Sequence, residues 1–172
     1  ILCNSYLPNW RKNINYTMSS SAHKSQGGGV ILDLSHELDY VRWLFGEVSL
    51  KFTEKGKFSK LSINTEDHLK LYGLVGKANL SIDLNYYSRI PKRIIFVNGE
   101  NFTIFIDLIK NEAEIQNKNV YFVKKLSNFN DNYTYIQQHK EILSNRFKNV
   151  CSYTFAKDTM KLIDRIKNWR NN

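Results

Sequence analysis

The feature that most constrains this chain is a change of hydrophobic period along its length. Across residues 48–124 apolar and polar side chains alternate, which is typical of strands with one buried face. Before that stretch, over 30–46, and after it, from residue 131 onward, apolar residues recur with the helical period. This order predicts an α+β domain in which one largely antiparallel open sheet has helices packed on one face.

Turn residues divide the alternating stretch into strands. Gly76-Lys77 separates two of them, and Asn98-Gly99 predicts a type I′ hairpin, because both central positions of that turn favour positive φ. Residues 9–26 are polar without a sustained period and are expected to form a loop. The expected strands are 1–7, 48–58, 69–75, 78–86, 93–97, 102–108, 112–116 and 120–124. The expected closing helices are 131–148 and 156–169, the second with an apolar stripe through Met160, Ile163 and Ile166 or Lys167.

The composition is that of one globular domain with a basic surface. Of the 172 residues, 42% are hydrophobic and 24% are charged. The net charge is +9, but the lysines and arginines are spread over the predicted elements, without a zinc-finger, RNA-recognition or basic-heptad pattern. We therefore expect no nucleic-acid partner, and the charge suits an anionic small substrate.

Several features favour a cytoplasmic protein without membrane contact. No apolar run approaches the roughly 20 residues of a transmembrane helix, and the first residues lack the order of a signal peptide. Cys3 and Cys151 are far apart and are expected to be reduced thiols rather than a disulfide. The chain begins Ile-Leu-Cys, as if inside a strand, and we expect it to be a fragment of a longer protein.

The stretch 27–47 carries most of the ionisable chemistry. Its three glycines allow a tight turn or a close approach of the backbone to a ligand. In the helix expected after them, one stripe is apolar and contains Leu34, Leu38, Val41 and Phe45. The opposite side contains Asp33, His36, Asp39 and Tyr40. Asp33 and His36 are neighbours on such a helix and are candidates for proton transfer, whereas the structural alternative is a dipole-favoured aspartate beside a surface histidine.

Spacing excludes two other interpretations of this stretch. A dinucleotide fingerprint needs G-x-G-x-x-G inside a βαβ unit, and a zinc-protease motif needs a second histidine where Tyr40 stands. A metal on His36 and Asp39 would lack further ligands nearby, so no metal site is expected. The loop before the glycines has side chains that suit a sugar or an anion, although each also fits an ordinary loop: Trp10, Arg11, Tyr16, His23 and Lys24.

Together these residues resemble a known family. The three glycines, Asp33, His36, Asp39 and the Trp-Leu-Phe-Gly of 43–46 are similar to the start of the C-terminal domain of the Gfo/Idh/MocA family, the relatives of glucose-fructose oxidoreductase and inositol dehydrogenase. The strand meander, the hairpin of 93–107 and the closing helix agree with that domain along nearly the whole chain. The resemblance implies the fold of a dihydrodipicolinate-reductase-like C-terminal domain.

The resemblance also implies an activity. In such enzymes an N-terminal Rossmann domain, absent from residues 1–172, binds NAD or NADP, and the C-terminal domain binds a sugar or cyclitol substrate. His36 would remove the hydroxyl proton as hydride leaves, and Asp33 would bind a substrate hydroxyl. Gly28 and Gly29 would lie near the cofactor. Further substrate contacts are expected from Arg11, Tyr16, Lys24 and Asp39.

The resemblance leaves one question open and implies further properties. Many members have three residues between the aspartate and the histidine, whereas only Leu34 and Ser35 intervene here, so the partner of His36 is open between Asp33 and Asp39. The resemblance also implies a homodimer or homotetramer formed through the open sheet face. The chain is also similar to members from nine-carbon sugar acid and surface-polysaccharide pathways, so the sugar is expected to be nucleotide-linked or acidic. Alone, the chain is expected to be inactive, and the alternative function is a non-catalytic sugar-binding or dimerisation domain.

Overall fold

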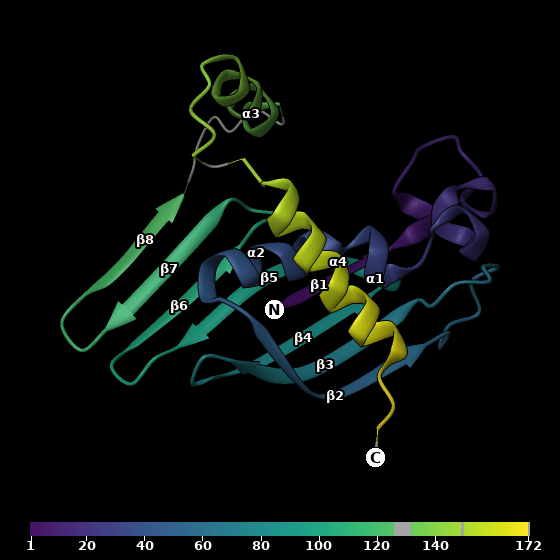
Figure 1. The fold of residues 1–172 in the computed structure, drawn as a ribbon. Helices are drawn as coiled ribbons and strands as arrows, with labels where there is room; N and C mark the ends of the chain where they lie inside the picture. The colour runs from purple at the N-terminus through teal and green to yellow at the C-terminus, as the bar shows by residue number, and fades with distance from the viewer. Residues whose placement is uncertain (126–131, 149, 172) are drawn as a thin grey trace.

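One eight-stranded sheet organises the chain in a computed structural model that describes residues 1–125, 132–148 and 150–171. The strand order is β2-β3-β4-β1-β5-β6-β7-β8 (Figure 1). The strands are β1 (Leu2–Tyr6), β2 (Val48–Gly56), β3 (His68–Val75), β4 (Ala78–Asn85), β5 (Tyr87–Asn98), β6 (Phe102–Asp107), β7 (Glu112–Asn117) and β8 (Tyr121–Lys125). Neighbouring strands are antiparallel except β1 and β4, which are parallel. The predicted α+β fold with a largely antiparallel sheet is confirmed.

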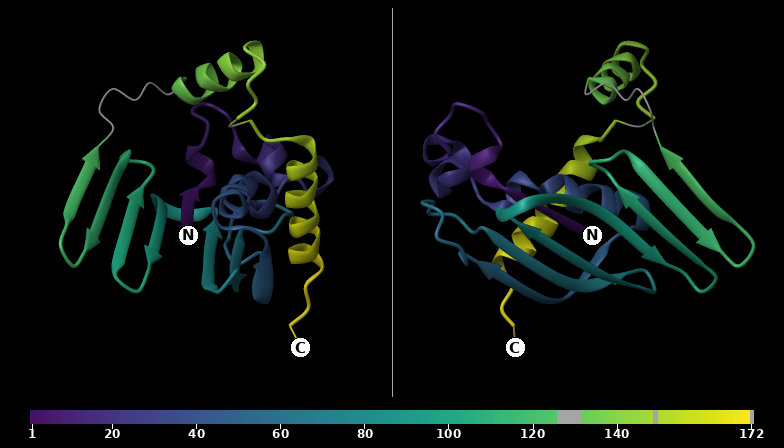
Figure 2. Two further views of the ribbon diagram at one scale, coloured as in Figure 1. Left: turned by 60° about the vertical axis from the view of Figure 1, so that its left-hand side comes forward. Right: turned by 180° about the vertical axis from the view of Figure 1, so that it is seen from behind.

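Helices cover one face of this sheet. The α-helices of the described residues are α1 (Val30–Asp33), α2 (Ser35–Phe45), α3 (Tyr133–Leu143) and α4 (Tyr153–Asn168). The helices α1, α2 and α4 pack on the half of the sheet around β1 to β4, whereas α3 stands apart (Figure 2). Asp131, the first residue of the expected helix 131–148, lies outside the described residues. No helix among the described residues is long and apolar enough to cross a membrane.

The core lies between the helices and this half of the sheet. Its fully buried side chains include Leu38, Val41, Leu69, Leu71, Ile82, Leu84, Leu162, Ile163 and Ile166. Two expected core positions were wrong, because Phe45 is 41% exposed and Met160 is 46% exposed. In α4 the buried positions next to Ile163 are Thr159 and Leu162. The hydroxyl of Thr159 is satisfied there by Arg42 and Asp39 of α2, so a polar residue can occupy the helix interface.

Two local expectations also need correction. The helix expected over 30–46 is divided at Leu34, which has φ −102° and ψ 23° and separates α1 from α2. The hairpin turn lies two residues later than expected, at Glu100-Asn101, because Asn98 still pairs with Thr103 and the Gly99 N–H donates to the Phe102 carbonyl at 2.8 Å. The expected positive φ at Asn98 and Gly99 was wrong, since neither residue has it. The other expected strands and turns agree with the structure to within a few residues at their ends, apart from β5, which begins at Tyr87.

The loop expected over 9–26 contains short 3₁₀ helices, namely η2 (Tyr16–Met18), η3 (Ser20–Ala22) and η4 (Lys24–Gln26), after η1 (Leu7–Asn9). Side-chain bonds hold this segment against the loop before β3. Thr65 Oγ1 donates to the Ser21 carbonyl at 3.0 Å. A polar stretch without a sustained period is therefore ordered here by contacts with a distant loop.

Candidate functional site

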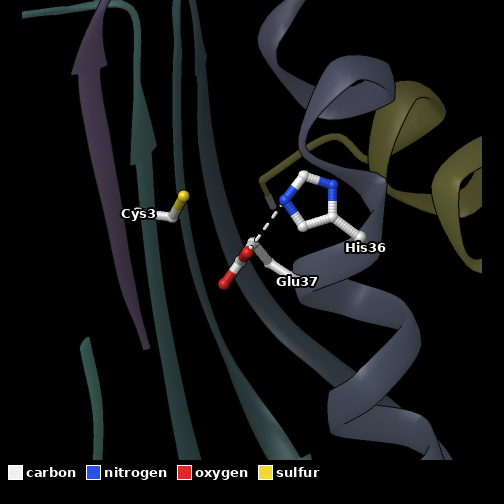
Figure 3. A group of neighbouring side chains, drawn as sticks. All are labelled: Cys3, His36 and Glu37. Atoms are coloured by element: carbon white, nitrogen blue, oxygen red, sulfur yellow. Dashed lines mark ion pairs between the residues drawn. The ribbon is translucent and has the colours of Figure 1, made fainter. Parts of the chain in front are cut away.

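The first turn of α2 contains a buried carboxylate with several donors. Glu37 is fully buried, and its Oε1 accepts a hydrogen bond from Arg93 Nε at 2.7 Å. Its Oε2 accepts from the Tyr40 hydroxyl at 2.6 Å. His36 Nε2 lies 3.0 Å from Oε1, and the Cys3 side chain lies beside the pair (Figure 3). Four side chains from α2, β1 and β5 thus converge on one carboxylate.

Strand register brings these groups together. Cys3 of β1 and Arg93 of β5 are paired across the two strands, so their side chains point to the same face of the sheet. That is the face on which α2 packs, because Glu37 and Leu38 of α2 are both fully buried. His36 precedes them by about 100° of helix rotation, and 49% of its side chain remains exposed. The imidazole therefore sits at the rim of the buried cluster, where a ligand can reach it.

Electrostatics keep Glu37 ionised. Burial opposes ionisation, but the hydrogen bonds from His36 and Tyr40 and the charge of Arg93 outweigh it, so the pKa of Glu37 lies below its usual value. Burial and the nearby Glu37 charge raise the pKa of the Cys3 thiol to about 12. Cys3 is therefore a neutral thiol at physiological pH and not a nucleophile.

The structure answers the question of which carboxylate partners His36, and neither expected residue is the one. The expected Asp33–His36 pair is corrected to a Glu37–His36 pair. The reason lies in the backbone, since Leu34 is not helical and the i, i+3 relation between Asp33 and His36 is lost across it.

Asp33 bonds to the sheet instead. As the last residue of α1, it accepts a hydrogen bond from the Tyr86 hydroxyl at 2.6 Å. Burial and this carboxylate raise the pKa of Tyr86, which stays a neutral donor. The Tyr86 ring packs edge-on against Trp10, with ring centroids 5.2 Å apart. Asp33 is thus half-buried and oriented by an aromatic pair at the end of β4.

Asp39 lies between α2 and α4 beside a cavity. It accepts a hydrogen bond from Thr159 Oγ1 at 2.8 Å. A cavity of about 270 Å³ adjoins it, lined by Asp39, Tyr40, Trp43, Lys148, Val150, Cys151, Ser152 and Phe155. Tyr40 connects the two regions, because its ring lines this cavity while its hydroxyl is bonded to Glu37.

The three loop residues that were expected to contact the substrate, Arg11, Tyr16 and Lys24, lie in two separate places. Arg11 and Tyr16 line one small recess of about 10 Å³ near Trp10. The Tyr16 hydroxyl accepts from the backbone N–H of Ser62 at 3.1 Å. Lys24 is exposed, and its backbone N–H donates to Asn64 Oδ1 at 2.7 Å.

The glycines have a packing function that the sequence did not reveal. A Cβ on Gly28 would overlap the backbone carbonyl of Ser20, so only glycine allows this close approach. Gly29 has φ +117°, and a Cβ there would collide with the carboxylate of Glu66. Gly28 therefore packs against the backbone of η3, and Gly29 packs against Glu66 in the segment before β3.

Cys3, His36 and Glu37 have a donor set that also suits a metal, since their ligand atoms lie within 4.8 Å of one another. Both Glu37 oxygens already accept hydrogen bonds from Arg93 and Tyr40, and the guanidinium brings a positive charge to the same oxygen that faces His36. The cluster therefore fits a hydrogen-bond network better than a cation site.

Glu37, Arg93 and Tyr86 were not among the expected site residues. For Glu37 a signal existed, because it lies next to Leu38 and three residues after Leu34 and so falls near the apolar stripe. A glutamate at such a position requires a buried partner. The identity of that partner, 56 residues away, had no signal in the sequence.

No family model and no curated protein matches this sequence. Solved structures match its fold. The UDP-N-acetylglucosamine 3-dehydrogenase GnnA from Acidithiobacillus ferrooxidans has a TM-score of 0.70 at 12% identity, over 96% of this chain and 50% of its own. An oxidoreductase from Agrobacterium radiobacter in complex with NAD+, L-tartaric acid and magnesium has a TM-score of 0.71 at 18% identity, and the match covers 98% of this chain and 55% of that one. The super-repressor mutant of Gal80p from Saccharomyces cerevisiae has a TM-score of 0.69 at 12% identity, and the match covers 96% of this chain and 53% of that one.

The present chain spans about half the length of each of these structures. They are Gfo/Idh/MocA-type proteins, mostly oxidoreductases, and one was solved with a bound nicotinamide cofactor. The resemblance stated from the sequence motif is therefore confirmed at the level of fold. This chain has the fold of Gfo/Idh/MocA-type oxidoreductases over about half their length, consistent with their C-terminal domain.

Proposed function

We propose that this chain is the substrate and oligomerisation domain of a cytoplasmic NAD- or NADP-dependent dehydrogenase that acts on a sugar or cyclitol. The observation that supports this most is a half-exposed imidazole, His36, bonded to a buried carboxylate in a fold shared with dehydrogenases. Histidine suits proton transfer near neutral pH, and a fixed ring suits a general base.

The described residues do not themselves fit a dinucleotide. They contain no βαβ unit with a glycine-rich phosphate loop, and Gly28 and Gly29 pack against protein atoms. The proposal therefore assigns NAD or NADP to a Rossmann domain outside residues 1–172, where it would accept hydride. This chain would hold the substrate hydroxyl near Asp33 and take its proton on His36.

An anionic or nucleotide-linked sugar is the substrate class we propose. The net charge is +9, and Arg11 and Lys24 are exposed on the segment before α1. Trp10 packs edge-on against Tyr86, whose hydroxyl orients Asp33, and an aromatic ring and a carboxylate in one region suit a sugar ring. The printed name of GnnA, a UDP-N-acetylglucosamine 3-dehydrogenase, supports the same class.

The test is substrate-dependent reduction of NAD or NADP by the full-length protein. UDP-linked sugars, sugar acids, neutral free sugars and cyclitols form the substrate panel, each measured with both cofactors. We expect turnover with a charged sugar and little with its neutral counterpart. Binding of a sugar without any reduction of either cofactor would instead support the alternative of a non-catalytic sugar-binding domain.

We also propose that the protein forms a homodimer or homotetramer through the open face of the sheet. Aromatic side chains gather on this face, including Phe52 and Tyr72, with ring centroids 6.2 Å apart, and Phe96 and Phe105, 6.3 Å apart. They alternate with core residues such as Leu71 and so point away from the helices. An exposed apolar face of this kind indicates an interface.

Two polar atoms add to this argument. Asn4 Oδ1 and Asp83 Oδ1 are buried without a hydrogen-bond partner among the described residues. Both residues alternate with core-facing neighbours on β1 and β4, so they lie on the open face. Buried polar atoms are normally satisfied, so these two oxygens leave unused hydrogen-bonding capacity just below the open face.

Replacing Phe96, which is 52% exposed, by lysine is expected to disrupt this assembly. Light scattering after size-exclusion chromatography of the full-length protein should give a smaller species for Phe96→Lys than for the wild type. Tyr153→Lys is the matched control, because Tyr153 is 82% exposed at the start of α4 and away from the open face. A monomeric wild type, or an unchanged mass for Phe96→Lys, would refute the interface.

A further inference from the structure

We infer that Glu37 is a positioning residue, which fixes His36 with its proton on Nε2 and leaves Nδ1 as the atom that takes the substrate proton. This inference rests on the proposed function for its catalytic consequence. Its structural part, the tautomer and its cause, stands independently of that function.

The carboxylate is immobilised on both sides. Arg93 Nε donates to Oε1 at 2.7 Å, and the Tyr40 hydroxyl donates to Oε2 at 2.6 Å. These donors come from β5 and from the next turn of α2, and Glu37 has no exposed surface. Its two oxygens therefore have one orientation, set by a strand and a helix rather than by a loop.

The charge state of Glu37 determines which of the two groups is the donor in its contact with His36. Because the pKa of Glu37 lies below its usual value, the group is a carboxylate at neutral pH and can only accept hydrogen bonds. His36 Nε2 lies 3.0 Å from Oε1, so in the neutral ring we place the hydrogen on Nε2, the nitrogen that faces the carboxylate. In a neutral imidazole the other nitrogen, Nδ1, holds the lone pair.

Other acids near α2 cannot perform this function as they stand. Asp33 is bonded to Tyr86 at 2.6 Å, and Asp39 is bonded to Thr159 at 2.8 Å. Cys3, the remaining ionisable neighbour on β1, has a pKa of about 12 and stays neutral. Glu37 is therefore the group that can orient the histidine and stabilise its cationic form after proton transfer.

Nitrogen NMR of isotope-labelled histidine in the full-length protein tests the tautomer directly. His36→Gln identifies which signal belongs to His36. We expect the wild-type signal to show hydrogen on Nε2 in the neutral ring. In Glu37→Gln, the amide can donate as well as accept, so the signal should move toward a mixture of both tautomers.

Kinetics test the catalytic consequence. We expect Glu37→Gln to lower kcat by about 10- to 100-fold, by analogy with carboxylates that orient metal-ligating histidines, with little change in KM for the sugar. Asp158→Asn is the matched carboxamide control, because Asp158 is partly exposed on α4 and paired with Lys161. It should keep the wild-type kcat.

Glu37→Gln leaves Arg93 without its charged partner, so the double variant Glu37→Gln/Arg93→Gln keeps the test usable if the single variant does not fold. Hydrogen on Nδ1 in the wild type, or an unchanged tautomer and kcat in the folded variants, overturns the inference. If His36→Ala retains full turnover while the wild-type NMR result holds, the proposed base is wrong but the positioning by Glu37 stands.

Discussion

Replacement of His36 by alanine is expected to lower kcat of the full-length protein by about 10²- to 10⁴-fold, the usual contribution of a general acid or base. The imidazole is more exposed than the Arg93 side chain (49% against 37%), and it lies 3.0 Å from the Glu37 carboxylate that orients it. Since 49% of its side chain is exposed, truncation leaves no sealed cavity in the core. The thermal unfolding midpoint should therefore remain close to that of the wild type.

The measurement combines steady-state kinetics with a thermal melt of the same preparation. His139→Ala is the matched control, because His139 is an exposed histidine on α3, bonded through Nδ1 to the Tyr135 carbonyl. It should leave kcat unchanged. Full turnover in His36→Ala would remove the proposed role of the histidine, and a loss shared by both variants would show that it is not specific to His36.

Replacement of Arg42 by methionine is expected to destabilise the protein by about 3 kcal/mol, from lost charge-assisted hydrogen bonds and lost packing of the side chain. The Arg42 side chain is 2% exposed. Its Nη1 donates to Thr159 Oγ1 at 2.6 Å and to the Phe155 carbonyl at 3.0 Å. Its guanidinium also stacks over the Phe155 ring, 4.5 Å from the centroid, and pairs with Glu47. One side chain thus joins α2 to α4.

Denaturant unfolding of the full-length protein measures this loss as a lower midpoint for Arg42→Met. Arg170→Met is the control, because Arg170 is exposed after the end of α4 and its replacement should change stability by less than about 0.5 kcal/mol. Arg42→Lys should fall between them, since it keeps the charge but not the fork of donors. Equal midpoints for Arg42→Met and Arg170→Met would show that the helix junction does not depend on Arg42.

Local patterns account for what could be predicted. The hairpin of β3 and β4 follows from alternating side chains and from Gly76-Lys77 between them, all of which are sequence neighbours. The exceptions arise where a distant contact outweighs the local pattern. Thr159 replaces Met160 in the core because Arg42 and Asp39 satisfy its hydroxyl, and Phe45 is exposed although it continues the stripe of α2.

By itself, the sequence determined the α+β class, the open antiparallel sheet and the placement of His36 on an accessible helix, because hydrophobic period is encoded over a few neighbouring residues. Only the tertiary structure decided which carboxylate pairs with that histidine and orients its ring. Leu34 interrupts the helix and separates Asp33 from His36, while β5 places Arg93 opposite Glu37 across 56 residues. Such a pairing depends on strand register and on packing of α2 against the sheet, which no local pattern specifies.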